Sequence, residues 1–441
     1  MLTYDDGALL CDGVAVGDLA RQVATPFFLF SEAQLRQNYH TLLEAFSGVP
    51  GGVSIDYCLK TNYEMGILTL LLELGAGVMV TCGWELQHAL RAGFPPARIT
   101  YHAPYKSDEE LAAAVEAGVG LIHVYSADEL QRLARVAADH GVPTSVSIRI
   151  PAPGSWLGRR VRGWYADRLG VPPDLALELL ERAAESEWLR PRGLSVHVGT
   201  QLARPAAHLR AVRKLMSLTL EASARGVTID DISLGGGWPS DTLQPINPRY
   251  ALTLLAGREP PALAPRLEPM ARRVAAAFRQ AAMQAGLPRP PLVRLEPGRG
   301  IVGAAGLLVT RVIGRRGRWL FVDGSHNLLP ESGLVGQREV RPGALGPHAE
   351  RHRWHVSGRT LNTADVMAVG AVLPDVEDGD LLVFRDAGAY SLSRATRYAG
   401  TIPDAYLLTP VGTLQQIRRK DTYDDIVGPM VGVGQRAGVL E

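Results

Sequence analysis

The chain has 441 residues, enough for one large domain with a smaller one, or for two to three ordinary domains. Hydrophobic residues make up 46% and charged residues 21%, as in soluble globular proteins, and a net charge of +1 gives no basis for binding nucleic acid or an anionic membrane. No apolar run approaches the roughly 20 residues of a membrane-spanning helix, and the acidic start "MLTYDDGALLCDG" lacks a signal-peptide pattern, so we expect a cytoplasmic protein.

Short β-type runs alternate with helical runs from about residue 53 to residue 299. Helical patterns such as "DEELAAAVEAG" lie between the strands, and the pairs Ser107–Glu110 and Ser126–Glu129 predict capping boxes. Eight strands, each linked by a helix, predict an α/β fold with a closed parallel (β/α)8 barrel of the TIM type. The expected strands cover 53–60, 77–82, 98–103, 120–126, 144–150, 193–200, 230–237 and 291–299.

Two connections in this pattern are long and irregular, at residues 151–173 and 238–265. Loops of this length in a compact domain are usually functional or disordered. Arginines in the first loop could recognise an acid or form a solvated basic lid; they are Arg159, Arg160, Arg162 and Arg168. After Gly300 the pattern changes to strands and turns without long helices, which predicts a second, mostly β domain.

Residues that can carry chemistry collect at the carboxyl ends of the expected strands, where barrels of this type have their active site. In chain order these are Lys60, His197, Gly235, Gly236, Gly237, Glu296, Gly298 and Arg299. Each alone has an ordinary explanation, such as a solvated lysine, a core histidine or a glycine turn. Together they offer an amine, an imidazole, a phosphate cradle and a carboxylate, which is the set that pyridoxal 5′-phosphate needs.

The sequence also resembles a known family, the fold-type III pyridoxal-phosphate decarboxylases, which include diaminopimelate, ornithine and arginine decarboxylases. The resemblance covers nearly the whole chain and is greatest to the diaminopimelate branch. Its motifs are "TPFFLFSEAQLRQNY", "YCLKTN", "HVGTQ", "LGGG", "EPGRGIV" and "DAGAYSLS". It implies a barrel at 27–300, an alanine racemase-like β domain at 301–441 joined by the N-terminal strand at 1–26, and a homodimer with shared active sites.

By matching motif, the resemblance implies a role for each site residue. Lys60 would form the Schiff base that links the cofactor, His197 would stack on the cofactor ring, and Glu296 would pair with the pyridine nitrogen. The residues implied on the phosphate side are Thr200, Gly235, Gly236, Gly237, Gly298, Arg299 and Tyr390. The implied activity is decarboxylation of an amino acid, with Lys60 and His197 as the catalytic residues.

The chain departs from the family where the β domain should supply a proton donor. The family has a cysteine followed by a glutamate there, whereas "GRTLNTADVMA" places Leu361 and Asn362 at these positions and keeps Asp365. No cysteine follows Cys82, so Lys60, water or another group must return the proton. "VDGSHNLLPES" also lacks the arginine and the tyrosine with which relatives recognise diaminopimelate.

These departures leave several interpretations of the function open. We expect a decarboxylase of an amino acid, or of one conjugated to a carrier, other than ordinary diaminopimelate. A pyridoxal-phosphate racemase or a decarboxylation-coupled transaminase would also suit the missing proton donor, and a non-catalytic regulatory binding protein is the alternative outside enzymes. No metal site is expected. The substrate-pocket candidates are Leu361, Asn362, Asp365 and His326.

Overall fold

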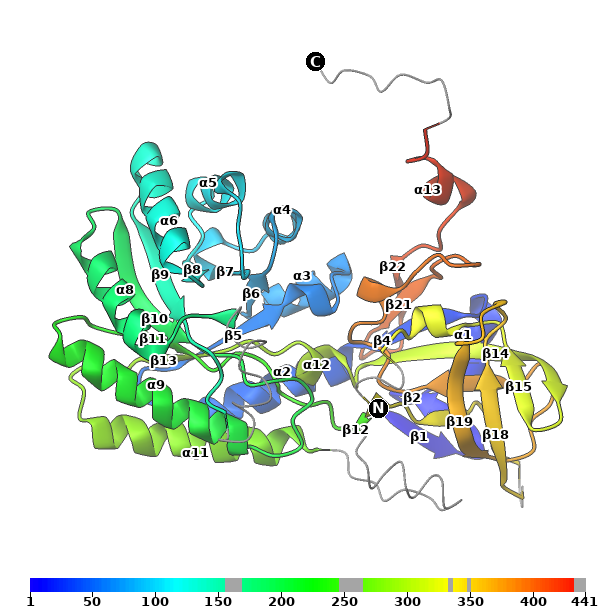
Figure 1. Ribbon diagram of the computed structural model, residues 1–441. Helices are drawn as coiled ribbons and strands as arrows, with labels where there is room; N and C mark the ends of the chain where they lie inside the picture. Colours follow the sequence, from blue (N-terminus) through cyan, green and yellow to red (C-terminus); the bar gives the residue numbers. More distant parts are fainter. Residues whose placement is uncertain (155–168, 246–264, 332–335, 347–349, 432–441) are drawn as a thin grey trace. The chain divides into compact units, whose positions relative to one another are not determined.

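The computed structural model describes residues 1–154, 169–245, 265–331, 336–346 and 350–431 (Figure 1). It divides into two compact units. Residues Gln34–Ala305 form the first, here called the barrel unit, and residues Met1–Ala33 with Gly306–Glu441 form the second, here called the β unit. Within the part that is described, no helix combines the length and the apolar character required to cross a membrane.

Eight parallel strands close the barrel, which confirms the predicted fold class. Closure occurs between the first and last strands, where Val293 pairs with Val53 and Leu295 with Ile55. The strands end one to five residues before the expected positions, so the polar residues of the predicted site lie in the segments that follow the strands. They are β5 (Val53–Cys58), β6 (Gly77–Val80), β7 (Ile99–His102), β8 (Leu121–Val124), β9 (Thr144–Arg149), β10 (Leu189–Ser195), β11 (Asp231–Ser233) and β13 (Leu292–Leu295).

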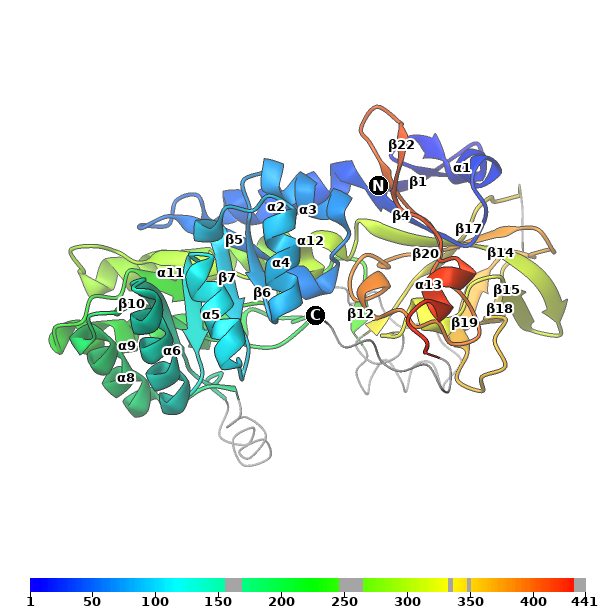
Figure 2. The ribbon, with the colours of Figure 1, turned by 90° about the horizontal axis from the view of Figure 1, so that it is seen from above.

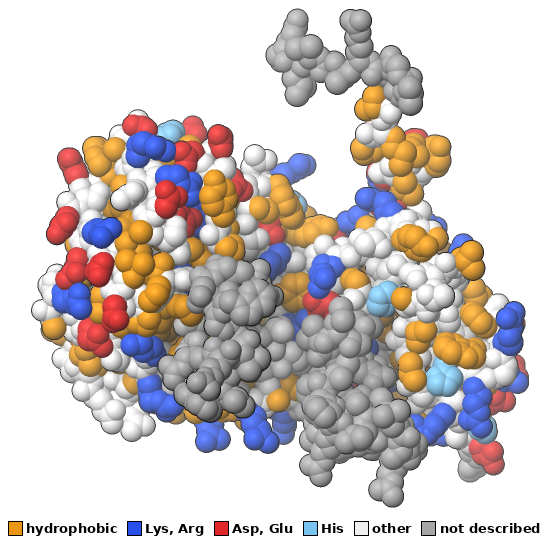
Figure 3. All heavy atoms as spheres, viewed as in Figure 1, with side chains coloured by type: hydrophobic (Ala, Val, Ile, Leu, Met, Phe, Trp, Pro, Cys, Tyr) orange, Lys and Arg blue, Asp and Glu red, His pale blue; other side chains and the backbone are white. Residues whose placement is uncertain are grey.

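Helices line the outside of the barrel, and α4, α5 and α6 lie next to one another in both ribbon views (Figure 1, Figure 2). On the face drawn in Figure 3, cationic and anionic side chains are interspersed over these helices. The elements are α2 (Glu32–Phe46), η1 (Leu59–Thr61), α3 (Met65–Glu73), α4 (Gly83–Arg91), η2 (Pro96–Arg98), α5 (Asp108–Glu116), α6 (Ala127–His140), α8 (Pro173–Glu185), α9 (Ala206–Ala224), β12 (Gln244–Pro245), α11 (Leu267–Ala285) and α12 (Arg299–Val302).

The two predicted capping boxes have different outcomes. Ser107 and Glu110 form the complete reciprocal box at the start of α5. At α6 the Ser126 side chain accepts from the Glu129 backbone as predicted, but the Glu129 carboxylate binds Lys106 Nζ (2.7 Å) and the Tyr125 backbone (2.6 Å) instead. The second box is therefore wrong in its glutamate half, because a buried lysine takes that carboxylate.

The β unit is built from both ends of the chain. A nine-stranded sheet runs β19-β18-β15-β14-β4-β21-β22, with β20 pairing β14 and β17, and a small sheet runs β1-β2-β3. The elements are β1 (Leu2–Asp5), β2 (Ala8–Cys11), β3 (Val14–Ala15), α1 (Val16–Gln22), β4 (Phe27–Ser31), β14 (Gly306–Arg316), β15 (Trp319–Val322), η4 (His326–Leu328), β16 (Gly336–Gln337), β17 (Val340–Pro342), β18 (His352–Ser357), β19 (Val366–Leu373), β20 (Leu381–Phe384), η5 (Leu392–Arg394), β21 (Ala405–Leu408), β22 (Leu414–Arg418) and α13 (Tyr423–Val427).

Strand β4 lies in the β unit, whereas the sequence analysis placed residues 27–31 with the barrel. It pairs antiparallel with β14, where Phe30 faces Gly306, and parallel with β21, where Phe28 faces Ala405. All five residues of the strand are buried. A strand that is apolar on both faces needs partners on both edges and cover on both sides, and a central position in the sheet provides them.

Candidate active site

Lys60 lies in the single 3-10 turn η1 that follows the first barrel strand. Its two neighbours, Leu59 and Thr61, are fully buried, whereas the Lys60 side chain is exposed. Tyr57, which precedes the turn, is linked to Asn62, which follows it: the Tyr57 hydroxyl donates to the Asn62 carbonyl (3.0 Å). The chain thus anchors the turn on both sides of Lys60 and leaves its amine accessible at the carboxyl end of the barrel.

His197 follows β10 and lies against the glycine segment after β11. The Gly236 N–H donates to His197 Nδ1 (3.2 Å), and a Cβ on Gly236 would lie 2.9 Å from the ring. Gly235 has a φ of 65°, and a side chain there would overlap with the Val196 carbonyl. The ring keeps an exposed surface, although the protein around it, and then the Arg149 charge, lower the pKa of His197 to about 4. The imidazole is therefore neutral at pH 7 and offers an open face.

The loops after β5, β11 and β13 are in close contact through glycines. A Cβ on Gly298 would overlap with Thr61 Oγ1, beside the Lys60 turn. Trp238 holds the glycine segment after β11 in place, because its Nε1–H donates to the Gly235 carbonyl (2.9 Å). Arg299, which begins α12, is buried. Glycine at these positions lets three loops approach one another more closely than residues with side chains would allow.

The remaining residues predicted on the phosphate side lie in different places. Thr200 is exposed just after His197, and Gly237 has a φ of 90° with the Gly199 carbonyl 3.0 Å from a notional Cβ. Tyr390 belongs to the β unit, where it has a φ of 54°. Tyr390 is thus not part of the barrel unit, and its contribution to a phosphate site stays a prediction.

Glu296 directly follows β13 and is only 4% exposed. Its Oε1 accepts hydrogen bonds from His102 Nε2 (2.9 Å) and from Ser233 Oγ. Its backbone N–H donates to the Gly235 carbonyl (3.0 Å), which ties it to the glycine segment. In the described part of the chain, Oε2 has no hydrogen-bond partner, so one carboxylate oxygen is held by protein and the other is available.

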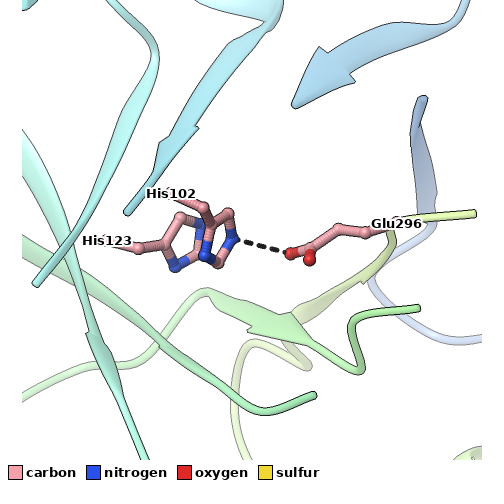
Figure 4. A group of neighbouring side chains, drawn as sticks. All are labelled: His102, His123 and Glu296. Atoms are coloured by element: carbon pink, nitrogen blue, oxygen red, sulfur yellow. Dashed lines mark hydrogen bonds and ion pairs between the residues drawn. The ribbon is translucent and has the colours of Figure 1, made fainter. Parts of the chain in front are cut away.

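Sequence reasoning missed the residues behind Glu296. His102 and His123 end or nearly end two neighbouring strands, β7 and β8, and Figure 4 shows them beside Glu296 with their rings overlapping. The ring centroids are 3.4 Å apart and the rings 16° from parallel. Arg149, at the end of β9, is also buried there. The available signal was a histidine near the carboxyl end of each of two apolar strands, "ITYH" and "LIHV".

Among the described residues, one group of side chains has possible metal ligands within reach of one another. One ligand atom from each of His102, His123 and Glu296 lies within 4.8 Å of the others. In-plane lone pairs of stacked rings run nearly parallel, whereas a metal ion needs ligands that converge on one point. The arrangement observed therefore suits hydrogen bonding to Glu296 better than coordination.

The four substrate-pocket candidates all lie in the β unit. Asp365 is buried, and its carboxylate accepts from the His326 backbone (2.7 Å) and from the Thr360 backbone (2.9 Å), so it fixes the loop. The amide oxygen of Asn362 accepts a hydrogen bond from the backbone N–H of Ala364 (3.0 Å). Leu361 is 99% exposed. Asp365 thus organises a loop whose tip is an exposed leucine, instead of offering a free carboxylate.

The arginines expected either to recognise an acid or to form a solvated basic lid lie outside the described residues, as does most of both long loops. These arginines are Arg159, Arg160, Arg162 and Arg168.

The family model for the pyridoxal binding domain of pyridoxal-dependent decarboxylases matches residues 32–303, more than half of the chain. The chain therefore belongs to this family, and it is a pyridoxal-phosphate-dependent carboxy-lyase. The family, the cofactor and the enzyme class expected from the sequence are confirmed.

Two relatives and one solved structure show how far the similarity extends. The chain is 29% identical over 434 residues to the diaminopimelate decarboxylase of Pseudomonas aeruginosa, covering 96% of this chain and 97% of that protein. It is 29% identical over 428 residues to the diaminopimelate decarboxylase of Methanothermobacter thermautotrophicus, with coverage of 96% and 95%. The crystal structure of diaminopimelate decarboxylase from Methanocaldococcus jannaschii matches with a TM-score of 0.86 and 25% identity over 98% of each chain.

The described residues of the barrel unit fit this cofactor. Lys60 and His197, which would touch it, are exposed, whereas Glu296 is buried with one free oxygen. Glycines stand where a Cβ would overlap with neighbouring atoms, which leaves backbone available to approach a phosphate. When bound, pyridoxal phosphate supplies an electron sink for the electron pair left behind as carbon dioxide departs.

Proposed function

We propose that the enzyme decarboxylates an amino acid other than ordinary diaminopimelate, with Lys60 as the residue that holds the cofactor. The exposed amine of Lys60, next to the neutral His197, supports this assignment. In this proposal, the backbone and side chains of the residues predicted on the phosphate side bind the cofactor phosphate. In the barrel unit those residues are Thr200, Gly235, Gly236, Gly237, Gly298 and Arg299, and Tyr390 of the β unit is included only as the prediction from the resemblance.

Each residue has a separate task in this proposal. The open face of the His197 imidazole packs against the cofactor ring and excludes water from that face of the ring. A neutral imidazole favours this contact because it carries no charge that water would have to solvate. Glu296 holds a proton on the ring nitrogen through Oε2, the oxygen that the protein leaves free. Lys60 Nζ, water or another group returns a proton to the substrate carbon.

The observation that carries the substrate proposal is the tip of the loop at residues 358–365. Leu361 is 99% exposed and cannot donate a proton, and neutral Asn362 uses its amide oxygen within the loop. A substrate with a distal ammonium needs a charge-assisted acceptor, and neither Leu361 nor Asn362 supplies one, whereas the exposed Arg359 of the same loop offers only a cation. The names of the relatives favour diaminopimelate as the second candidate.

The proposal also includes an assembly and a compartment. The proposed assembly is a homodimer with shared active sites, in which the exposed Leu361 on the loop fixed by Asp365 contacts the second copy of the chain. A cytoplasmic location is also part of the proposal. An amino acid conjugated to a carrier stays within the proposal, because a neutral, exposed tip leaves room for a larger group.

The test is carbon dioxide release by the cofactor-loaded protein from separate free amino acids, including diaminopimelate, lysine, ornithine and arginine, and from their N-acyl conjugates. We expect release from at least one compound other than diaminopimelate and none above background from the Lys60→Ala variant. Turnover of free diaminopimelate with kcat of roughly 1–10³ per second would contradict the substrate proposal. Undiminished release by Lys60→Ala would contradict the site.

A further inference from the structure

His102 makes contacts that the reaction as proposed does not use. Its Nε2 bonds to Glu296 Oε1 (2.9 Å) and its Nδ1 lies 3.0 Å from the Tyr125 hydroxyl. We propose that His102 is a positioning residue for Glu296, which it orients so that the second carboxylate oxygen faces the ring nitrogen of the cofactor. The inference rests on the proposed role of Glu296.

The first step is the unequal use of the two carboxylate oxygens. His102 and Ser233 both donate to Oε1, and in the described structure no group donates to Oε2. Two donors on one oxygen fix the rotation of the carboxyl group about its last bond, because any turn would break both bonds. A ring N–H that arrives at the site therefore meets an acceptor already in place, which lowers the entropy cost of binding.

The second step is the direction of the hydrogen bonds. A carboxylate only accepts, so the His102 proton must lie on Nε2, and Nδ1 must accept from the Tyr125 hydroxyl. Burial, and then the Arg149 charge, lower the pKa of His102 well below its usual value, so the ring is neutral. Burial raises the pKa of Tyr125 to about 12, so its proton stays. Tyr125 donates to His102, and His102 donates to Glu296.

The third step is the rigidity of the donor. The His123 ring stacks on His102 with centroids 3.4 Å apart, and His123 Nδ1 lies 3.0 Å from Ser195 Oγ. His102 and His123 face each other in the register between β7 and β8, and both are almost fully buried (Figure 4). The ring plane of His102 is therefore fixed by a stacked neighbour, and Nε2 stays directed at Glu296.

Two amide substitutions test this proposal. In His102→Gln the amide nitrogen stands near the position of Nε2, whereas in His102→Asn it stands near that of Nδ1. Affinity for pyridoxal phosphate is measured on the apo-protein by equilibrium dialysis. We expect His102→Gln to stay within about 3-fold of the wild type and His102→Asn to bind roughly 10–100-fold more weakly, as for other lost bonds to a charged group.

A cofactor analogue separates positioning from a general structural role. In 1-deazapyridoxal phosphate a C–H replaces the ring nitrogen, so Glu296 has no ring proton to hold. We expect the difference between the two variants to disappear with this probe. Tyr125→Phe removes only the far hydroxyl and should weaken pyridoxal phosphate binding about 2–10-fold, again without effect on the analogue.

Several outcomes would overturn the inference. Equal affinity of the two amide variants for pyridoxal phosphate would do so, as would a difference that persists with the analogue. Stoichiometric zinc on the purified apo-protein, lost together in both variants, would show a metal site instead. Wild-type protein that binds neither probe would contradict the proposed function itself, whereas wild-type binding with no variant effect would contradict only the role of His102.

Discussion

At the level of single residues, Gly298 shows how little space separates the loops of the site. A Cβ there would overlap with Thr61 Oγ1, and Thr61 is fully buried beside the Lys60 turn. We expect Gly298→Ala to destabilise the apo-protein by about 1–3 kcal/mol, as overpacking does, and to weaken cofactor binding because the Lys60 turn is displaced. Urea unfolding and equilibrium dialysis measure the two effects.

A second substitution and a control make this prediction specific. Thr61→Ala removes the oxygen that the new methyl group would meet, so the double variant should recover most of the loss in stability. Gly314→Ala adds the same methyl group where nothing lies within 4 Å and should change stability little. Equal losses in Gly298→Ala and Gly314→Ala would mean that the close approach to Thr61 has no energetic weight.

The residues of the site differ in how far the sequence predicts them. Lys60 and Glu296 stand in motifs at strand ends, and an amine and a carboxylate at one rim of a barrel already point to a cofactor. His102 and His123 could not be assigned in this way, because a histidine in an apolar strand is equally typical of a core. Their contact depends on the register that sets them opposite each other, and register is a property of the folded sheet.

At the level of the elements, Arg294 joins three barrel strands through buried ion pairs. Its Nη1 lies 2.5 Å from Asp56 of β5 and its Nη2 lies 2.6 Å from Asp231 of β11. Both carboxylates are almost fully buried. We expect Arg294→Met to cost roughly 3–5 kcal/mol in the free energy of unfolding, because it leaves two buried carboxylates without a cation.

The matched control for this variant is an exposed pair of the same chemistry. Arg315 binds Asp375 at 2.9 Å, with side chains that are 45% and 66% exposed. Arg315→Met should cost at most about 1 kcal/mol, because water already screens the pair. Similar midpoints of urea unfolding for the two variants would show that the barrel pairs contribute no more than a surface pair.

The sequence predicts most of the elements but not all of their partners. Alternating apolar runs and helices identify all eight barrel strands, because each parallel strand is followed by its own covering helix. "FFLFS" is as clear a strand, yet its neighbours are β14 and β21, hundreds of residues further along the chain. An apolar run shows that a strand is buried on both faces, and it carries no information on which sheet buries it.

At the level of the whole molecule, several buried imidazoles make stability depend on pH. Burial is the largest cause that lowers the pKa of His208 to about 4, and it lowers the pKa values of His102 and His123 well below 6.5. Between these values and the unfolded value of about 6.5, the unfolded chain binds protons that the folded chain does not. The contribution of these histidines to stability is therefore fully present above about pH 6.5 and is lost as the pH falls from there toward their pKa values in the folded chain.

His208 allows this dependence to be measured one proton at a time. It is fully buried, and its Nε2 donates to the Gly236 carbonyl (3.0 Å), a bond that His208→Gln can keep through its amide. Between pH 6 and pH 5 the wild-type free energy of unfolding should fall faster than that of His208→Gln, by about 1.4 kcal/mol per pH unit for one proton. His140→Gln, at the end of α6 and exposed, should follow the wild type. Parallel pH profiles for wild type and His208→Gln in urea unfolding would mean that His208 is protonated in the folded chain, because the unfolded chain would then take up no extra proton.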